Sequence, residues 1–155
     1  MKLGDVLKKE RERKKLTAAD VAGRLGITLE QYQEVETGNS PAEVWGPRLA
    51  LIAIALQTPT SRLIAETGRS AQAQQVAGQC GKLISSHREK RGLSQKELAE
   101  KLDISASEMK SIEDGTTPLE TYAPVLLSFS ETIGQPIFNL FYPCGLPLDK
   151  LTDYP

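Results

Sequence analysis

Residues 92–115 read GLSQKELAEKLDISASEMKSIEDG, and their spacing predicts two short helices joined by a tight turn. Ser94 is followed three residues later by Glu97, and Ser105 by Glu108. Each pair has the spacing of a capping box, in which a hydroxyl and a carboxylate bond to the free amides of a helix's first turn. We therefore expect one helix to begin just after residue 94 and the next just after residue 105.

Apolar residues in the same stretch predict how the two helices pack. Leu98, Ala99 and Leu102 give the first helix one apolar face, and Met109 and Ile112 give the second helix an inward face. Alanine is small enough to let a helix that crosses at a steep angle come close. Two helices packed in this way around a tight turn form a helix-turn-helix motif.

Composition places the chain among ordinary globular proteins. It has 155 residues, of which 39% are hydrophobic and 25% charged, enough for one domain or two small ones. The longest apolar run, ALIAIAL around Ile52, is too short to span a bilayer. The N-terminal segment MKLGDVLKKERERKK lacks the apolar core and cleavage site of a signal peptide. We therefore expect a cytoplasmic protein with no membrane partner.

Residues for catalysis or for metal binding are scarce. Cys80, Cys144 and His87 are too few and too scattered for a zinc site. Reduced thiols at Cys80 and Cys144 suit the expected compartment. A disulfide between the two cysteines is the alternative, if the two ends of the second half of the chain meet in space. Ser85 and Ser86 precede the histidine on one helix and so do not face it. The sequence predicts no catalytic residue, no cofactor, no metal and no evident small-molecule ligand, so we expect no enzyme activity.

The chain contains two copies of one unit, offset by 77 positions. Residues 3–65 align with residues 80–142 without a gap. Identical pairs along the alignment include Gly4/Gly81, Arg11/Arg88, Ala22/Ala99, Glu36/Glu113, Gly38/Gly115, Pro47/Pro124 and Pro59/Pro136. Two copies are too few for a solenoid, so the pattern indicates a tandem duplication.

Each unit is predicted to hold five helices. The first four should span residues 2–14, 18–25, 29–37 and about 45–56, and residues 79–91, 95–102, 106–114 and about 122–133. Further caps are expected at Thr28 with Gln31, Ser40 with Glu43 and Thr117 with Glu120. The fifth helices should begin at Pro59 and Pro136. The predicted boundaries are residues 1–66 for the first domain, 67–78 for a linker, 79–142 for the second domain and 143–155 for a C-terminal tail.

At these residues the chain resembles the Xre/Cro-type helix-turn-helix family of phage repressors and bacterial regulators. The second unit has an arginine in its first helix, then L-S-Q-x-E-L-A-x-K-L, a turn with isoleucine, a serine cap and a closing I-E-D-G. The first unit, which closes with V-E-T-G, matches more loosely. The resemblance implies an all-α fold of two tandem five-helix lambda-repressor-like domains and a repressor-like transcriptional regulator that binds double-stranded DNA. It also implies two structural ion pairs, Arg11 with Glu36 and Arg88 with Glu113.

The resemblance further implies which residues contact DNA. In this family the third helix enters the major groove with its N-terminal half, while the start of the second helix and the loop after the third lie on phosphates. In the second unit these positions hold Gln95, Lys96, Ser105, Ala106, Ser107, Lys110, Ser111 and Thr116, with Arg91 near the end of the first helix. In the first unit they hold Thr17, Leu29, Glu30, Gln33 and Glu34.

Charge leaves a second function open. The net charge is −1, and neither third helix has the arginine or asparagine that makes bidentate base contacts. Glu30 and Glu34 would bring negative charge to a polyanion, or they form an ordinary solvated helix face. We therefore expect the second unit to contact DNA more directly, and the alternative is a pair of degenerate units that binds protein. The two units could cover two half-sites as a covalent pseudo-dimer, or two chains could pair as a homodimer.

Overall fold

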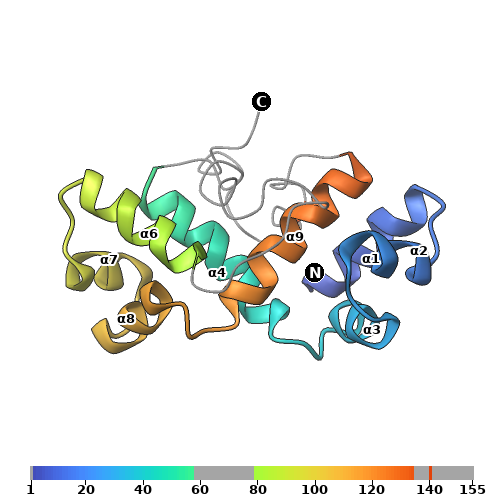
Figure 1. Ribbon diagram of the computed structural model, residues 1–155, viewed down its shortest axis with the longest axis horizontal. Helices are drawn as coiled ribbons and strands as arrows, with labels where there is room; N and C mark the ends of the chain where they lie inside the picture. The colour runs from blue at the N-terminus through green and yellow to red at the C-terminus, as the bar shows by residue number, and fades with distance from the viewer. Residues whose placement is uncertain (1, 58–78, 135–139, 141–155) are drawn as a thin grey trace.

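The computed structural model describes residues 2–57, 79–134 and 140, and all regular structure in these residues is α-helical (Figure 1). The first unit contains α1 (Leu3–Arg13), α2 (Ala18–Leu25), α3 (Leu29–Thr37) and α4 (Ala42–Ala55). The second unit contains α6 (Gln79–Lys90), α7 (Gln95–Leu102), α8 (Ala106–Asp114) and α9 (Leu119–Ile133). The all-α prediction is confirmed. The predicted fifth helices, linker and C-terminal tail fall outside the described residues, apart from Leu140.

Two of the five predicted caps form as complete capping boxes. Ser94 accepts a hydrogen bond from the backbone N–H of Glu97, whose carboxylate accepts from the N–H of Ser94. Thr28 and Gln31 form the same reciprocal pair at the start of α3. At α8 the box is incomplete. Ser105 accepts from the N–H of Glu108, but it is the hydroxyl of Ser105, not its backbone N–H, that donates to the carboxylate, at 3.4 Å.

The fourth helices begin three residues earlier than predicted. Pro41 and Pro118 directly precede α4 and α9 with helical backbone angles, φ −59° in each. A proline tolerates this position because its missing N–H would have no partner inside the helix. The chain therefore turns into the helix at once instead of after a further loop.

The predicted carboxylate caps on the fourth helices are wrong. Glu43 instead accepts hydrogen bonds from the backbone N–H groups of Leu3 and Gly4, at 3.0 and 2.7 Å. Glu120 does the same for Cys80 and Gly81, at 3.1 and 2.8 Å. The N-terminus of a helix has unpaired amides and a partial positive charge, so it competes successfully for a nearby carboxylate. This contact fastens α1 to α4 and α6 to α9.

The two fourth helices are exchanged between the units. The first three helices of each unit pack on one another, α1 and α2 on α3, and α6 and α7 on α8. Helices α4 and α9 cross in the middle of the molecule, and each continues to the opposite unit (Figure 1). There α4 packs on α7, and α9 packs on α2. Each helix-turn-helix motif is thus completed by a helix of the other unit.

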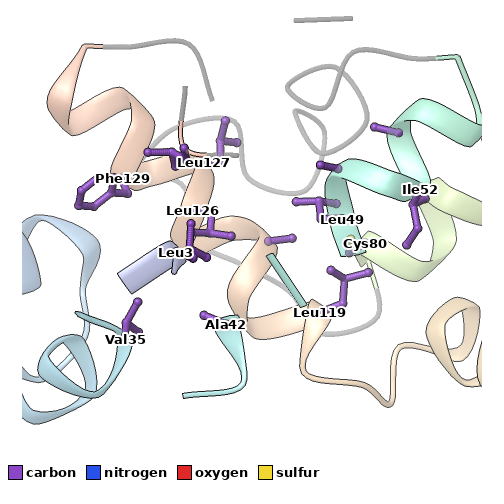
Figure 2. Close-up of a cluster of buried hydrophobic side chains, with 14 of the residues drawn as sticks. Leu3, Val35, Ala42, Leu49, Ile52, Cys80, Leu119, Leu126, Leu127 and Phe129 are labelled. Carbon is purple, nitrogen blue, oxygen red and sulfur yellow. The ribbon is translucent and has the colours of Figure 1, made fainter. Parts of the chain in front are cut away.

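The core is accordingly continuous across the two units. Leu49 and Ile52 of α4 and Leu126 and Phe129 of α9 are at most 1% exposed and belong to one cluster with core residues of both units (Figure 2). Apolar burial stabilises the fold in proportion to the area removed from water. Neither unit therefore holds a complete core by itself.

Cys80 is a buried thiol in this core. Its burial, with a smaller contribution from the charge of Glu120, raises its pKa to about 12. A thiol with so high a pKa is a poor nucleophile near neutral pH. Cys144 lies outside the described residues.

Among the helices that the structure describes, none is both long and apolar enough to cross a lipid bilayer.

Candidate nucleic-acid interface

A bidentate ion pair in each unit fixes the end of the third helix against the first helix. Arg11 bonds both carboxylate oxygens of Glu36, at 2.6 and 3.1 Å, and Arg88 bonds both oxygens of Glu113, at 2.7 and 3.0 Å. Both predicted pairs are confirmed. The remaining guanidinium nitrogen of each arginine donates to a backbone carbonyl at the end of the following turn, that of Leu16 or Leu93.

The electrostatics of the second pair favour the ionised state of both partners. Burial raises the pKa of Glu113, but hydrogen bonds from Arg88 and Gln95 and the nearby positive charge outweigh burial, so the pKa lies below its usual value. The carboxylate in turn raises the pKa of Arg88. The pair therefore holds α8 to α6 at any pH near neutrality.

The side chain of Gln95 adds a hydrogen bond to the ion pair of the second unit. Its Nε2 donates to the Oε1 of Glu113 at 3.0 Å, whereas the family resemblance implied that this residue contacts a phosphate. The backbone N–H of this residue lies in the first turn of α7, where a phosphate is favourably bound. Ala18 occupies the equivalent position in the first unit, so Glu36 receives no such third bond there.

Helix α8 presents a small polar surface outward. Met109 and Ile112 are buried, while Ala106, Ser107 and Lys110 are exposed. Lys110 lies 3.8 Å from Asp114 in an exposed pair that solvent screens. The exposed N-terminal half of α8 is what the resemblance requires of a helix that reads bases.

Three of the predicted contact residues in the second unit have intramolecular roles. Ser105 caps α8. Ser111 is half-buried and donates to the carbonyl of Ser107 at 3.2 Å, and Thr116 donates to the carbonyl of Ser111 at 3.2 Å. These hydroxyls hold the start of α8 and the loop that follows it.

Helix α3 presents a different surface at the equivalent place. Glu30, Gln33 and Glu34 are exposed, and Leu29 is 40% exposed at the first residue of the helix. Tyr32 faces inward and is buried. The predicted reading face of the first unit is therefore accessible, but it is acidic and apolar, whereas that of α8 carries small side chains and the basic Lys110.

The residues predicted to contact the phosphate backbone of DNA lie around the turn into the second helix of each unit. Arg91 and Lys96 are exposed on either side of the cap at Ser94, and Arg91 also donates to the carbonyl of His87. In the first unit Thr17 accepts from the N–H of Asp20 and caps α2, and Lys15, two residues before it, is exposed. Lysine and arginine at such a turn can neutralise phosphates without reading sequence.

Two contacts that the sequence did not indicate hold the third helices from across the molecule. The ring of Tyr32 in α3 stacks on that of Phe129 in α9, with centroids 6.4 Å apart. Glu108 in α8 lies 3.6 Å from Arg48 in α4, and that guanidinium also sits over the ring of Trp45. Arg48 is the only basic residue of α4 and is followed by an apolar run, and this isolated positive charge was the available signal.

Two known protein families match the sequence of this chain. The family described as "Helix-turn-helix domain" matches residues 2–60, and the family described as "Helix-turn-helix" matches residues 84–121. The protein is therefore a tandem helix-turn-helix protein, with one domain in each unit. The second family is the Xre/Cro type, so residues 84–121 are similar to that type of helix-turn-helix domain. No match was found among curated proteins or among solved structures.

Proposed function

We propose that the protein is a sequence-specific transcriptional regulator that binds double-stranded DNA in the cytoplasm and acts as a repressor. The observation that carries the proposal is the outward face of α8. Ala106, Ser107 and Lys110 are exposed on it, while the opposite face is buried and the helix end is fixed by Arg88 and Glu113. A helix held in this way can enter the major groove without reorganisation.

Each exposed group has a counterpart on the duplex. The hydroxyl of Ser107 can bond to base edges, and the methyl of Ala106 suits the thymine methyl group. Lys96, Arg91 and Lys110 supply positive charge for the phosphates on either side. Occupation of a promoter by this unit would exclude the polymerase, which is the simplest route to repression.

A selection of DNA duplexes from a random library, with the full chain as the binding protein, tests the proposal. We expect an enriched motif, with an affinity that falls as salt rises because each neutralised phosphate releases counterions. Ser107→Ala should weaken discrimination at one base pair, whereas Lys96→Gln should weaken binding to all duplexes alike. Glu100→Gln, an exposed change on α7, is the control. The absence of binding at micromolar protein and low salt would refute the proposal.

A protein-binding role for the first unit is the second candidate, and the exposed Glu30 and Glu34 favour it. If α3 docks a protein and does not touch DNA, Glu30→Gln with Glu34→Gln should leave the DNA affinity and the selected motif unchanged. If α3 lies in the groove, the same change should alter both.

A further inference from the structure

We infer that one chain reads one bipartite, non-palindromic duplex site, with α3 on one half-site and α8 on the other. The inference rests on the proposed function and adds to it the kind of DNA that the protein recognises. Three features of the structure carry it: the exchange of α4 and α9, the position of the two third helices, and the different side chains that they expose.

The exchange fixes the two third helices relative to each other. Tyr32 of α3 is buried against Phe129 of α9, which belongs to the other unit. Glu108 of α8 pairs with Arg48 of α4, which also crosses from the other unit. Each reading helix is thus contacted by the opposite half of the chain, and the packing of α4 on α7 and of α9 on α2 sets the distance between α3 and α8.

The exchange is also reciprocal, which is the contact pattern of a two-fold axis. Helix α4 packs on α7 as α9 packs on α2, and the two cross each other. Symmetric dimers repeat each contact in this way. Figure 1 places α3 and α8 at the two ends of the same lower edge of the molecule, with the crossed helices between them. Helices placed in this way suit two inverted half-sites on one face of a duplex.

The two reading faces nevertheless differ at every equivalent position. Under the offset of 77, the equivalent pairs are Leu29 and Ala106, Glu30 and Ser107, Gln33 and Lys110, and Glu34 and Ser111. A carboxylate accepts from the cytosine amino group, and glutamine suits adenine, whereas serine and lysine have other partners. A palindrome presents the same bases to both helices, so it would suit only one of them.

A second chain is not needed to complete this arrangement. The apolar side chains of Leu49, Leu126 and Phe129, which would otherwise form a homodimer interface, are buried inside the single chain. One copy therefore already supplies two reading helices, as a homodimer does in palindrome-binding relatives.

The full chain tests the inference in a selection from random duplexes followed by native mass spectrometry. We expect two different half-site motifs at one fixed spacing, and one chain per duplex. Insertion of five base pairs between the halves turns one of them to the far side of the helix, since a turn takes about 10.5 base pairs. This insertion should weaken binding by tenfold or more.

Single substitutions identify which helix reads which half. Glu30→Gln should change the base preference in one half-site only, and Ser107→Ala in the other only, with Glu100→Gln changing neither. A palindromic motif, two chains per site, or binding that the insertion leaves unchanged would overturn the inference while leaving the proposed function standing. Failure to bind any duplex would overturn the proposed function itself, and this inference with it.

Discussion

Arg48 in the first unit reaches across the molecule to within 3.6 Å of Glu108, in the first turn of the third helix of the second unit. The same carboxylate was expected to complete a capping box with Ser105. One oxygen of this carboxylate, Oε1, accepts from the hydroxyl of Ser105 at 3.4 Å, and the other, Oε2, lies 3.6 Å from Arg48. The contact with Arg48 ties α8 to the exchanged helix α4.

This ion pair should contribute little to stability. Arg48 and Glu108 are 26% and 53% exposed in their side chains, so solvent screens their attraction. A double-mutant cycle with Arg48→Gln and Glu108→Gln should give a coupling of about 0.5 kcal/mol, which decreases as salt rises. Urea denaturation of the four proteins measures it. A coupling that high salt leaves unchanged would contradict this account.

Phe129→Ala should destabilise both units together. The side chain is fully buried and stacks on Tyr32 of the other unit, so its removal should cost about 3–5 kcal/mol. Because the core is continuous, thermal unfolding should remain one transition with a lower midpoint. Leu51→Ala, on a residue that is 41% exposed, is the control and should have a small effect. Two separate transitions, of which only one moves, would show that the units fold independently.

Glu113 should make the protein sensitive to acid. Its pKa is lower in the folded chain than its usual value of 4.5. Its stabilising contribution is therefore complete above about pH 4.5 and is lost as the pH falls through the lower, folded pKa. Glu113→Gln should destabilise the protein by about 3 kcal/mol at pH 7, since it removes the charge that faces the partly buried Arg88.

The same substitution should also flatten the acid limb of the stability profile, measured by denaturation between pH 7 and pH 3. Glu97 and Asp20 also have lowered pKa values, so the variant retains part of the slope. Equal slopes for the variant and the wild type would contradict the assignment to Glu113.

Two turns carry a side chain in a left-handed conformation where the other unit has glycine. Lys15 has φ 57° and its equivalent Gly92 has φ 68°, while Asp103 has φ 56° and its equivalent Gly26 has φ 72°. Lys15→Gly and Asp103→Gly relieve this strain, although glycine loses more entropy on folding. We expect each to stabilise the protein by roughly 0.5–1 kcal/mol, measured by urea denaturation. A loss of stability would mean that the side chains hold the turns.

Gly4→Ala should disrupt the packing of α1 on α3. A Cβ at this position would collide with the backbone carbonyl oxygens of Val35 and Glu36, which cannot move aside cheaply. We expect a loss of about 1–3 kcal/mol, or failure to fold. Gly23→Ala is the matched control, because a Cβ there meets nothing within 4 Å and should stabilise α2 by about 0.5–1 kcal/mol. Equal effects of the two substitutions would contradict the close approach.

The sequence by itself determined the features that depend on neighbours along the chain or on the repeat. The helix starts at Ser94 and Thr28 follow from capping groups three residues apart, where few competing partners exist. The pairs Arg11–Glu36 and Arg88–Glu113 were predicted because the family resemblance supplied the long-range contact that spacing alone does not contain.

Only the tertiary structure decided where the fourth helices go. The apolar face of α4 could have covered its own unit or the other one, since the hydrophobic effect has no direction and both choices bury similar side chains. In the folded chain α4 crosses to α7, and the carboxylate of Glu43 turns to the free amides of α1. The path of α4 and the partner of Glu43 both depend on which surfaces meet in three dimensions. The order of residues along the chain does not specify those contacts.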